Sequence, residues 1–278
     1  MTDGRDHPRD PATAAAESRA APFDLGDGDA LVVGASRGVG HALARRLAAQ
    51  PPGGTPPRRL FVTHRGAMPP ETLAALADEA ACEVVPLRCE LAEDRSIRAL
   101  GATLAERDAR LLLTLHAAGI LHEAGVEPEK ALKQLERDAL HRVFDINSFA
   151  PLLVAQAVMN RIPRRAPAHF AALSAMVGSI GDNRLGGWYA YRASKAALNQ
   201  LLKTLSVEAR RTHRGLCITA IHPGTTDTDL SRPFQGNVPD DKLYTPSESA
   251  RRILDVVLAG QPEDSGRFMN WDGKPLPW

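Results

Sequence analysis

The chain has 278 residues, and its 34 lysines and arginines against 33 aspartates and glutamates give a formal net charge of +1. This balance leaves no basic surplus to hold a nucleic-acid backbone, so no nucleic-acid partner is predicted. Hydrophobic residues make up 44% and charged residues 24%, close to the average of soluble globular domains, and the length suits one large α/β domain.

The N-terminal segment, residues 1–27, mixes Asp, Arg, Pro and Ala without the apolar core of a signal peptide. We expect it to be a disordered tail before a single domain over residues 28–278. Every apolar run is far shorter than the ~20 residues that a membrane-spanning helix needs, so no membrane segment is predicted. Cys82, Cys89 and Cys217 have no CxxC spacing. They argue against a disulfide framework and a zinc site, and we expect a cytoplasmic protein without a bound metal.

Past this tail, short apolar runs alternate with longer amphipathic ones, which is typical of βαβ units. The expected strands are ALVVGA from Ala30, RLFVTH from Arg59, CEVVPL from Cys82, LLLTLH from Leu111, HFAALS from His169, LCITAI from Leu216 and a last one near Arg267. The clearest helical stretches are HALARRLAAQ after Gly40, ETLAALADEA after Pro70 and YRASKAALNQLLKTLSVEARR from Tyr191. PPGGTPP from Pro51 is expected to be a surface loop. The pattern predicts one Rossmann-type doubly wound α/β domain, with a seven-stranded parallel sheet flanked by helices.

The first predicted strand runs into GASRGVG and then a helix, which places Gly34, Gly38 and Gly40 at GxxxGxG spacing. In this context Gly34 permits a tight turn, and Gly38 and Gly40 let the backbone approach a pyrophosphate at the positive end of the helix dipole. An ordinary glycine turn is the alternative. The place of GASRGVG at the first βα connection favours a dinucleotide site over this alternative.

Two arginines bear on the choice of cofactor. Arg37 lies inside the glycine turn, and Arg65 follows the second strand, where an acidic residue would otherwise bind a ribose 2′-hydroxyl. Each alone could be a solvated surface residue. Together they favour a 2′-phosphate, so NADP is the predicted cofactor, with NAD as the alternative.

Tyr191 and Lys195 are four residues apart near the start of a long helix, so they share one helix face. The adjacent ammonium is expected to lower the pKa of the tyrosine, because it stabilises the phenolate. Such a tyrosine can act as a general acid and base. On composition alone, a packed tyrosine ring and a solvated lysine would be the favoured interpretation, because both residues are common in helices.

Further motifs accompany this pair in a fixed order, namely GASRGVG at Gly34, HAAG at His116, Asn147 in VFDINSFAP, Ser174 in LSAMVGSI, YRASK at Tyr191 and HPGTTDTDL at His222. In order and approximate spacing they resemble the short-chain dehydrogenase/reductase family over residues 28–278. GGWYAYRASKAALNQLL and the ending WDGKPLPW resemble its C-factor and sniffer-type carbonyl reductase subgroup.

The resemblance implies an NADP(H)-dependent oxidoreductase that transfers a hydride between the nicotinamide and a small carbonyl or alcohol substrate. In family terms Tyr191 is the catalytic acid or base, and Lys195 lowers its pKa and binds the nicotinamide ribose. Asn147 helps hold a proton-relay water, and Ser174 hydrogen-bonds the substrate carbonyl. The implied cofactor-binding residues are Gly34, Ser36, Arg37, Gly38, Val39, Gly40, Arg65, Glu90, Leu91, Ala117, Ala118, Gly119, Tyr191, Lys195, Pro223, Gly224, Thr226 and Thr228.

The chain departs from the family pattern at three positions. The usual NNAG reads HAAG, and we expect His116 to be a packed histidine that closes its strand. Glu90 replaces an aspartate near the adenine, which is a conservative change. In the family's SSxxG motif the working serine stands three residues before the glycine, where this chain has Ala175. We expect Ser174 to take its place through a bulge at the strand end, with Ser179 or no serine at all as alternatives.

The intact set of Tyr191, Lys195 and Asn147 favours a carbonyl reductase or alcohol dehydrogenase. A dinucleotide-binding, C-factor-like signalling protein with little turnover is the alternative. A structural domain that binds no cofactor is the third hypothesis.

The substrate pocket is expected among residues 120–129, 176–188 and 229–243, beyond the carboxyl ends of the strands. Trp188 and Phe234 suggest an apolar substrate face, unless each packs against a neighbouring loop. Apolar positions on the helices that contain Leu153 and Leu201 are consistent with a homodimer or homotetramer.

Overall fold

The computed structural model describes residues 23–49, 54–66, 70–78 and 80–278 of the chain. Its centre is a seven-stranded sheet in the order β3-β2-β1-β4-β5-β6-β9, in which all neighbouring strands are parallel. The strands are β1 (Asp29–Val33), β2 (Arg59–His64), β3 (Glu83–Arg88), β4 (Leu111–His116), β5 (Ala168–Leu173), β6 (Leu216–His222) and β9 (Arg267–Asn270). The strand order reverses between β1 and β4, and such a switch point opens a crevice at the carboxyl ends of the strands.

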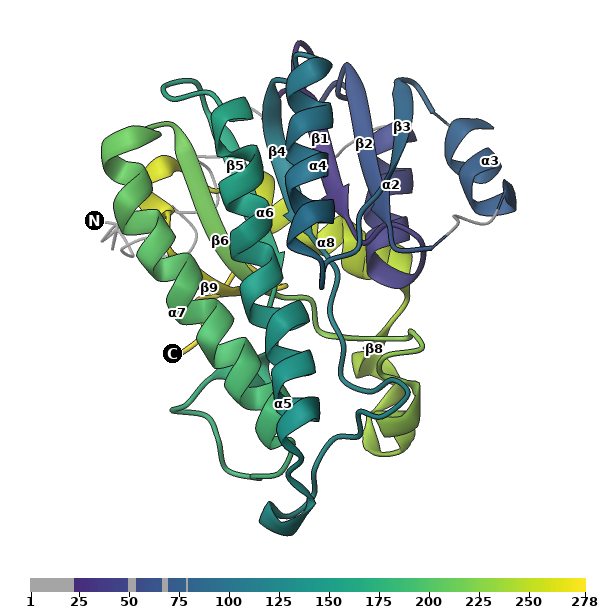
Figure 1. The fold of residues 1–278 in the computed structure, drawn as a ribbon, viewed down its shortest axis with the longest axis vertical. Coiled ribbons are helices and arrows are strands. Elements are labelled where there is room, and N and C mark those ends of the chain that lie inside the picture. Colours follow the sequence, from purple (N-terminus) through teal and green to yellow (C-terminus); the bar gives the residue numbers. More distant parts are fainter. Residues whose placement is uncertain (1–22, 50–53, 67–69, 79) are drawn as a thin grey trace, which may run out of the picture.

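Helices cover both faces of this sheet (Figure 1). One face carries α4 (Asp94–Glu106), α5 (Arg137–Phe144), α6 (Ala150–Val158) and the long α7 (Tyr189–Thr212). The other carries α2 (Gly38–Ala49) and α8 (Pro246–Leu258), which pack against each other, and α3 (Pro70–Asp78), which contacts α2 and β3. Beyond the carboxyl ends of the strands, the two-residue strands β7 (Thr225–Thr226) and β8 (Leu243–Tyr244) pair with each other.

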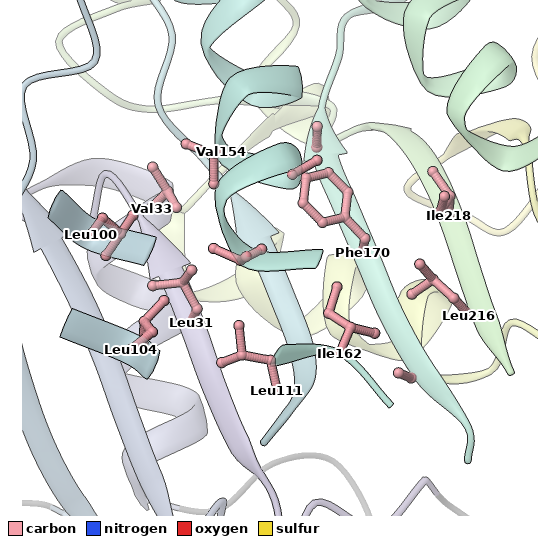
Figure 2. Packing of buried hydrophobic residues seen from close by; sticks show 14 of the residues in the cluster. Leu31, Val33, Leu100, Leu104, Leu111, Val154, Ile162, Phe170, Leu216 and Ile218 are labelled. Atoms are coloured by element: carbon pink, nitrogen blue, oxygen red, sulfur yellow. The ribbon is translucent and has the colours of Figure 1, made fainter. Parts of the chain in front are cut away.

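Two hydrophobic cores lie on the two faces of the sheet, because successive residues of a strand point to opposite sides. Leu31 and Val33 of β1 belong to the core beneath α4, α6 and α7, whereas Ala30 and Val32 belong to the core beneath α2 and α8. Figure 2 shows the first of these cores, with Phe170 of β5 at its centre. Burial on both faces is the physical reason for the nearly continuous apolar strands of the sequence.

The predicted seven-stranded parallel sheet is confirmed, and α2, α3 and α7 match the predicted helices. Residues 51–53 of the predicted loop and residues 1–22 of the predicted tail lie outside the described residues. Residues 23–27 are described, and two of them, Phe23 and Leu25, pack against the domain. Leu25 is fully buried, and the ring of Phe23 meets His169 edge-on at 4.4 Å between ring centroids. The packed part of the chain therefore begins before the boundary expected at residue 28.

A π-helical segment, Asp145–Phe149, joins α5 to α6. The wider turn of a π-helix inserts an extra residue into the helix and shifts the side chains that face its neighbours. Here it carries Ile146, Asn147 and Ser148, all buried, against α7. Sequence periodicity over so short a segment gives no signal for this irregularity.

Candidate cofactor and active site

A cavity of about 740 Å³ lies at the carboxyl ends of the central strands, which is a suitable size for a small-molecule or cofactor site. The predicted residues that line it are Gly34, Ser36, Arg37, Gly38, Val39, Gly40, Arg65, Glu90, Leu91, Ala117, Ala118, Gly119, Ser174, Tyr191, Lys195, Pro223, Thr226 and Thr228. Two predicted site residues, Asn147 and Gly224, are not part of its lining. Gly224 instead turns the chain at φ +80° between β6 and β7, where a Cβ would lie 2.8 Å from the Tyr244 ring.

Two glycines of the turn, Gly34 and Gly40, have no room for a side chain. A Cβ on Gly40 would lie 2.0 Å from the carbonyl oxygen of Gly34, so α2 starts directly against the turn. Gly34 and Gly38 have φ values of +85° and +55°, a region that favours glycine. The unpaired N–H groups at the start of α2 are therefore brought to the cavity wall, where they favour a negatively charged ligand.

Arg37 and Arg65 both line the cavity and are both largely exposed. Arg37 forms an ion pair with Asp229 at 3.3 Å, and Arg65 forms one with Glu123 at 3.5 Å. Exposed ion pairs at such distances contribute little stability, so both guanidinium groups can exchange their partners for a ligand phosphate at small cost.

Tyr191 and Lys195 come from the first turns of α7, and both line the cavity. The Lys195 Nζ lies 5.7 Å from the centre of the Tyr191 ring and donates a hydrogen bond of 2.7 Å to the Leu173 carbonyl oxygen. Burial raises the pKa of Tyr191 to about 12 and lowers the pKa of Lys195 to about 8. In the protein without a bound cofactor, the expected lowering of the Tyr191 pKa is therefore wrong, because the loss of hydration outweighs the attraction of the Lys195 ammonium.

Gly119 keeps a polar space open beside this pair. A Cβ at this position would lie 3.3 Å from the Asn147 Oδ1 and 3.5 Å from the Lys195 Nζ. Together with the glycine turn and the exposed arginines, this space fits the phosphates and ribose groups of a dinucleotide.

Asn147 lies in the π-helical segment and is fully buried. Its Oδ1 accepts a hydrogen bond from the Ile120 N–H at 2.8 Å, and its Nδ2 donates to the Ile120 carbonyl at 2.8 Å and to the Ser194 Oγ at 3.1 Å. The side chain therefore fixes the loop after β4 against α7. Its predicted part in holding a water beside Lys195 stays a prediction.

The two candidate serines occupy different surroundings. Ser174 follows β5, lines the cavity and donates a hydrogen bond of 2.7 Å from its Oγ to the Asn199 Oδ1. Ser179 is also buried, but its Oγ donates to the Trp278 carbonyl at 3.2 Å and accepts from the Asp182 N–H at 3.1 Å. Of the two, only Ser174 contributes to the lining of this cavity.

The sequence comparisons agree with this geometry. The family model for short chain dehydrogenases matches residues 29–238. The chain belongs to this family. The 1-hydroxy-2-glutathionyl-2-methyl-3-butene dehydrogenase of Rhodococcus sp. (strain AD45) is 31% identical over 255 residues, which cover 89% of this chain and 98% of that protein. The C-signal of Myxococcus xanthus is 35% identical over 148 residues, which cover 53% of this chain and 84% of that protein.

Among solved structures, the NADPH-bound carbonyl reductase from chicken fatty liver superposes on this short-chain dehydrogenase with a TM-score of 0.79 and 30% sequence identity. The match covers 91% of this chain and 100% of that chain. The predicted family and its C-factor and carbonyl reductase relatives are thus confirmed. Together these similarities support an NAD(P)-dependent oxidoreductase.

His116 is one of the positions at which this short-chain dehydrogenase departs from the family pattern. It is the last residue of β4, and it is 1% exposed, which agrees with the expected packed histidine that closes the strand. Its Nε2 has no hydrogen-bond partner among the described residues. Burial, with a smaller contribution from the positive charge of Lys195, lowers its pKa to about 3.

The cavity lining also includes His122 and Glu123, which lie in the range 120–129 expected at the substrate pocket but were given no individual role from the sequence. Glu123 accepts a hydrogen bond from the Arg142 Nε at 2.6 Å, and this guanidinium holds the pKa of Glu123 below its usual range. His122 contacts the carbonyl oxygens of Asp229 and Leu230 at 3.1 and 3.2 Å. The only sequence signal for these residues is their place in the loop after β4. Their individual contacts could not be predicted, because His122 meets residues of the loop after β6 that are more than 100 positions away.

None of the helices in the described ranges is long and apolar enough to cross a membrane.

Proposed function

We propose that this protein is an NADP(H)-dependent carbonyl reductase or alcohol dehydrogenase in which Tyr191 is the general acid and base. The observation that carries the proposal is the meeting of Tyr191 and Lys195 with the glycine turn around one cavity. The turn and the start of α2 would hold the pyrophosphate, and Arg37 and Arg65 would hold a 2′-phosphate. When bound, the nicotinamide supplies the hydride.

The chain's own residues would supply the proton. Carbonyl reduction needs a protonated tyrosine, and burial keeps Tyr191 in that form because it raises the pKa to about 12. Oxidation of an alcohol, the reverse reaction, needs the Tyr191 phenolate. This state would be favoured by the positive charge of an oxidised nicotinamide, when bound. Lys195, with its pKa lowered to about 8, is still mostly protonated at neutral pH and would donate to the nicotinamide ribose.

Ser174 is the proposed hydrogen-bond donor to the substrate carbonyl, because it lines the cavity and Ser179 does not. In the structure the Ser174 hydroxyl donates its hydrogen bond to the Asn199 Oδ1, so it must rotate before it can donate to a substrate carbonyl. Asn147 would position the loop after β4 through Ile120.

A small-molecule carbonyl or alcohol substrate also agrees with the names of the relatives, one a dehydrogenase and one a carbonyl reductase. A second candidate, a dinucleotide-binding signalling protein with little turnover, is favoured by two observations. Ala175 stands where the family has its working serine, and the C-signal is 35% identical over half of the chain.

The test is the oxidation of NADPH and NADH by the purified full chain with a panel of aldehydes, ketones and quinones. The proposal expects substrate-dependent oxidation of NADPH, with NADH used less efficiently. Saturable NADPH binding without turnover of any carbonyl compound would overturn the reductase and support the second candidate. The absence of both binding and turnover would leave the structural domain of the third hypothesis.

A further inference from the structure

The segment that leads into α7 has an uncommon backbone. Gly186, Gly187 and Trp188 have φ values of +64°, +67° and +50°, so successive residues adopt the left-handed conformation. Two of them are glycines, for which this conformation is inexpensive. Trp188 is not, and a bulky residue with positive φ persists only where its surroundings hold it.

Glu129 holds this turn from one side. Its carbonyl oxygen accepts the N–H of Trp188, and its Oε2 accepts the N–H of Ala190 at 3.2 Å. Trp188 stands at the N-cap position of α7 but offers no side-chain acceptor, so Glu129, which lies 61 positions before Ala190, supplies the cap. The Glu129 side chain is 4% exposed, and its Oε1 has no partner among the described residues.

Arg192 holds the same turn from the helix side. Its Nε donates to the carbonyl oxygens of Gly186 and Gly187 at 3.2 and 3.0 Å. The turn is thus fixed by one residue from the loop after β4 and one from α7. So much hydrogen bonding around a strained tryptophan indicates that the position of its ring matters.

The ring of Trp188 contacts two aromatic side chains edge-on. Its centroid lies 6.2 Å from that of Tyr191 and 4.9 Å from that of Phe234, which comes from the 3₁₀ helix Arg232–Asn237. His122 extends the row, at 5.9 Å from Phe234. We call Trp188, Phe234 and His122 the aromatic wall. It begins directly beside the tyrosine at which a carbonyl group would react.

We propose that Trp188 determines which carbonyl substrates are accepted beside Tyr191, and that Glu129 is the positioning residue that holds Trp188 in place. This inference rests on the proposed reductase function. An aromatic wall favours substrates whose carbonyl group carries an aromatic or other flat apolar substituent, because ring edges and faces attract each other beyond simple burial. Small hydrophilic carbonyl compounds gain nothing from it.

The test compares kcat/KM for an aromatic ketone or aldehyde with that for a short aliphatic aldehyde. Trp188→Gly removes the ring and suits the left-handed backbone, and we expect the aromatic-to-aliphatic ratio to fall about tenfold. Phe234→Leu, which leaves the turn intact, should shift the ratio in the same direction by a smaller factor. Leu185→Ala is the matched control, because Leu185 is 92% exposed in the same loop. It should leave the ratio unchanged.

Glu129 is tested in the same assay. Glu129→Ala should lower the ratio as Trp188→Gly does, whereas Glu129→Gln, which retains an acceptor oxygen for Ala190, should restore most of it. The Kd for NADPH should stay within about twofold of wild type in every variant, since none of these residues lines the cofactor cavity.

If the wild type is active and both Trp188→Gly and Phe234→Leu keep its aromatic-to-aliphatic ratio, this inference is overturned. The proposed reductase function is not affected by that result. Loss of selectivity in step with a weaker Kd for NADPH would also overturn it. A wild type that binds NADPH but reduces no carbonyl compound would overturn the proposed function and this inference with it.

Discussion

The proposed site has two sides, which are built in different ways. The cofactor side comprises the glycine turn of residues 34–40 and the strand ends around it, and the substrate side comprises the aromatic wall and the turn that leads into α7. On the cofactor side, main-chain contacts join strand ends, as in the hydrogen bonds of 2.9 Å from the Ala35 N–H to the Thr63 carbonyl and from the Ala117 N–H to the Val33 carbonyl. On the substrate side, side chains from distant segments hold short helices and turns, as Glu129 does for the start of α7. The cofactor side should therefore be sensitive to added atoms, and the substrate side to the loss of particular side chains.

The largest effect is expected where the cofactor side has no space. Gly40→Ala places a Cβ 2.0 Å from the Gly34 carbonyl oxygen, so the turn and α2 must separate. We expect the free energy of unfolding to fall by about 3 kcal/mol and NADPH binding to be lost, measured by chemical denaturation and fluorescence titration. Gly66→Ala is the control, because Gly66 lines the same cavity and has nothing within 4 Å of an added Cβ. If Gly40→Ala and Gly66→Ala had the same stability and NADPH binding, the close main-chain packing at Gly40 would not be what the cofactor side depends on.

An intermediate effect is expected from the charges on the cofactor side. Arg65→Gln removes a guanidinium that could bind a 2′-phosphate, and we expect the Kd for NADPH to rise about tenfold while that for NADH stays nearly constant. Arg88→Gln, at the exposed end of the neighbouring strand β3, should change neither value. Parallel weakening of both cofactors by Arg65→Gln would contradict the assignment of a 2′-phosphate to this position.

A smaller effect concerns His116, at the boundary between the two sides. Its pKa of about 3 in the folded protein lies below the ordinary value of 6.5, so between these pH values only the unfolded chain binds the proton. The contribution of His116 to stability is complete above pH 6.5 and is lost as the pH falls toward 3. His116→Asn should therefore reduce the slope of unfolding free energy against pH, by up to about 1.4 kcal/mol per unit.

Denaturation of His116→Asn at several pH values between 4 and 7 gives this slope. His141→Asn, on the exposed side of α5, serves as the control. A slope in His116→Asn equal to that of wild type would show that the buried imidazole is not what weakens the fold in acid.

The same contrast explains what the sequence could predict. The succession of strands and helices along the chain, the glycine turn and the pairing of Tyr191 with Lys195 follow from local patterns, because hydrophobic alternation, glycine spacing and helical periodicity act over a few residues. These features are confirmed in the fold and in the lining of the cavity. The predicted roles of the site residues and the homodimer or homotetramer stay predictions.

The rest could not be predicted because it depends on contacts between distant segments. The cap from Glu129 to Ala190 and the pairing of Trp188 with Phe234 join loops whose relative position is set only by the folded sheet. The pKa of Tyr191 was predicted in the wrong direction for the same reason. The four-residue spacing to Lys195 is local, whereas the burial that raises the pKa to about 12 comes from the whole domain.

The central claim is that Tyr191 transfers the proton at a site that binds NADPH. The most direct measurement is carbonyl-dependent NADPH oxidation by Tyr191→Phe, at saturating NADPH, against Tyr189→Phe, which removes the same hydroxyl from an exposed ring two residues earlier. We predict that Tyr191→Phe lowers kcat at least about 100-fold with little change in the Kd for NADPH, and that Tyr189→Phe keeps wild-type turnover. Turnover by Tyr191→Phe close to that of wild type would contradict the account.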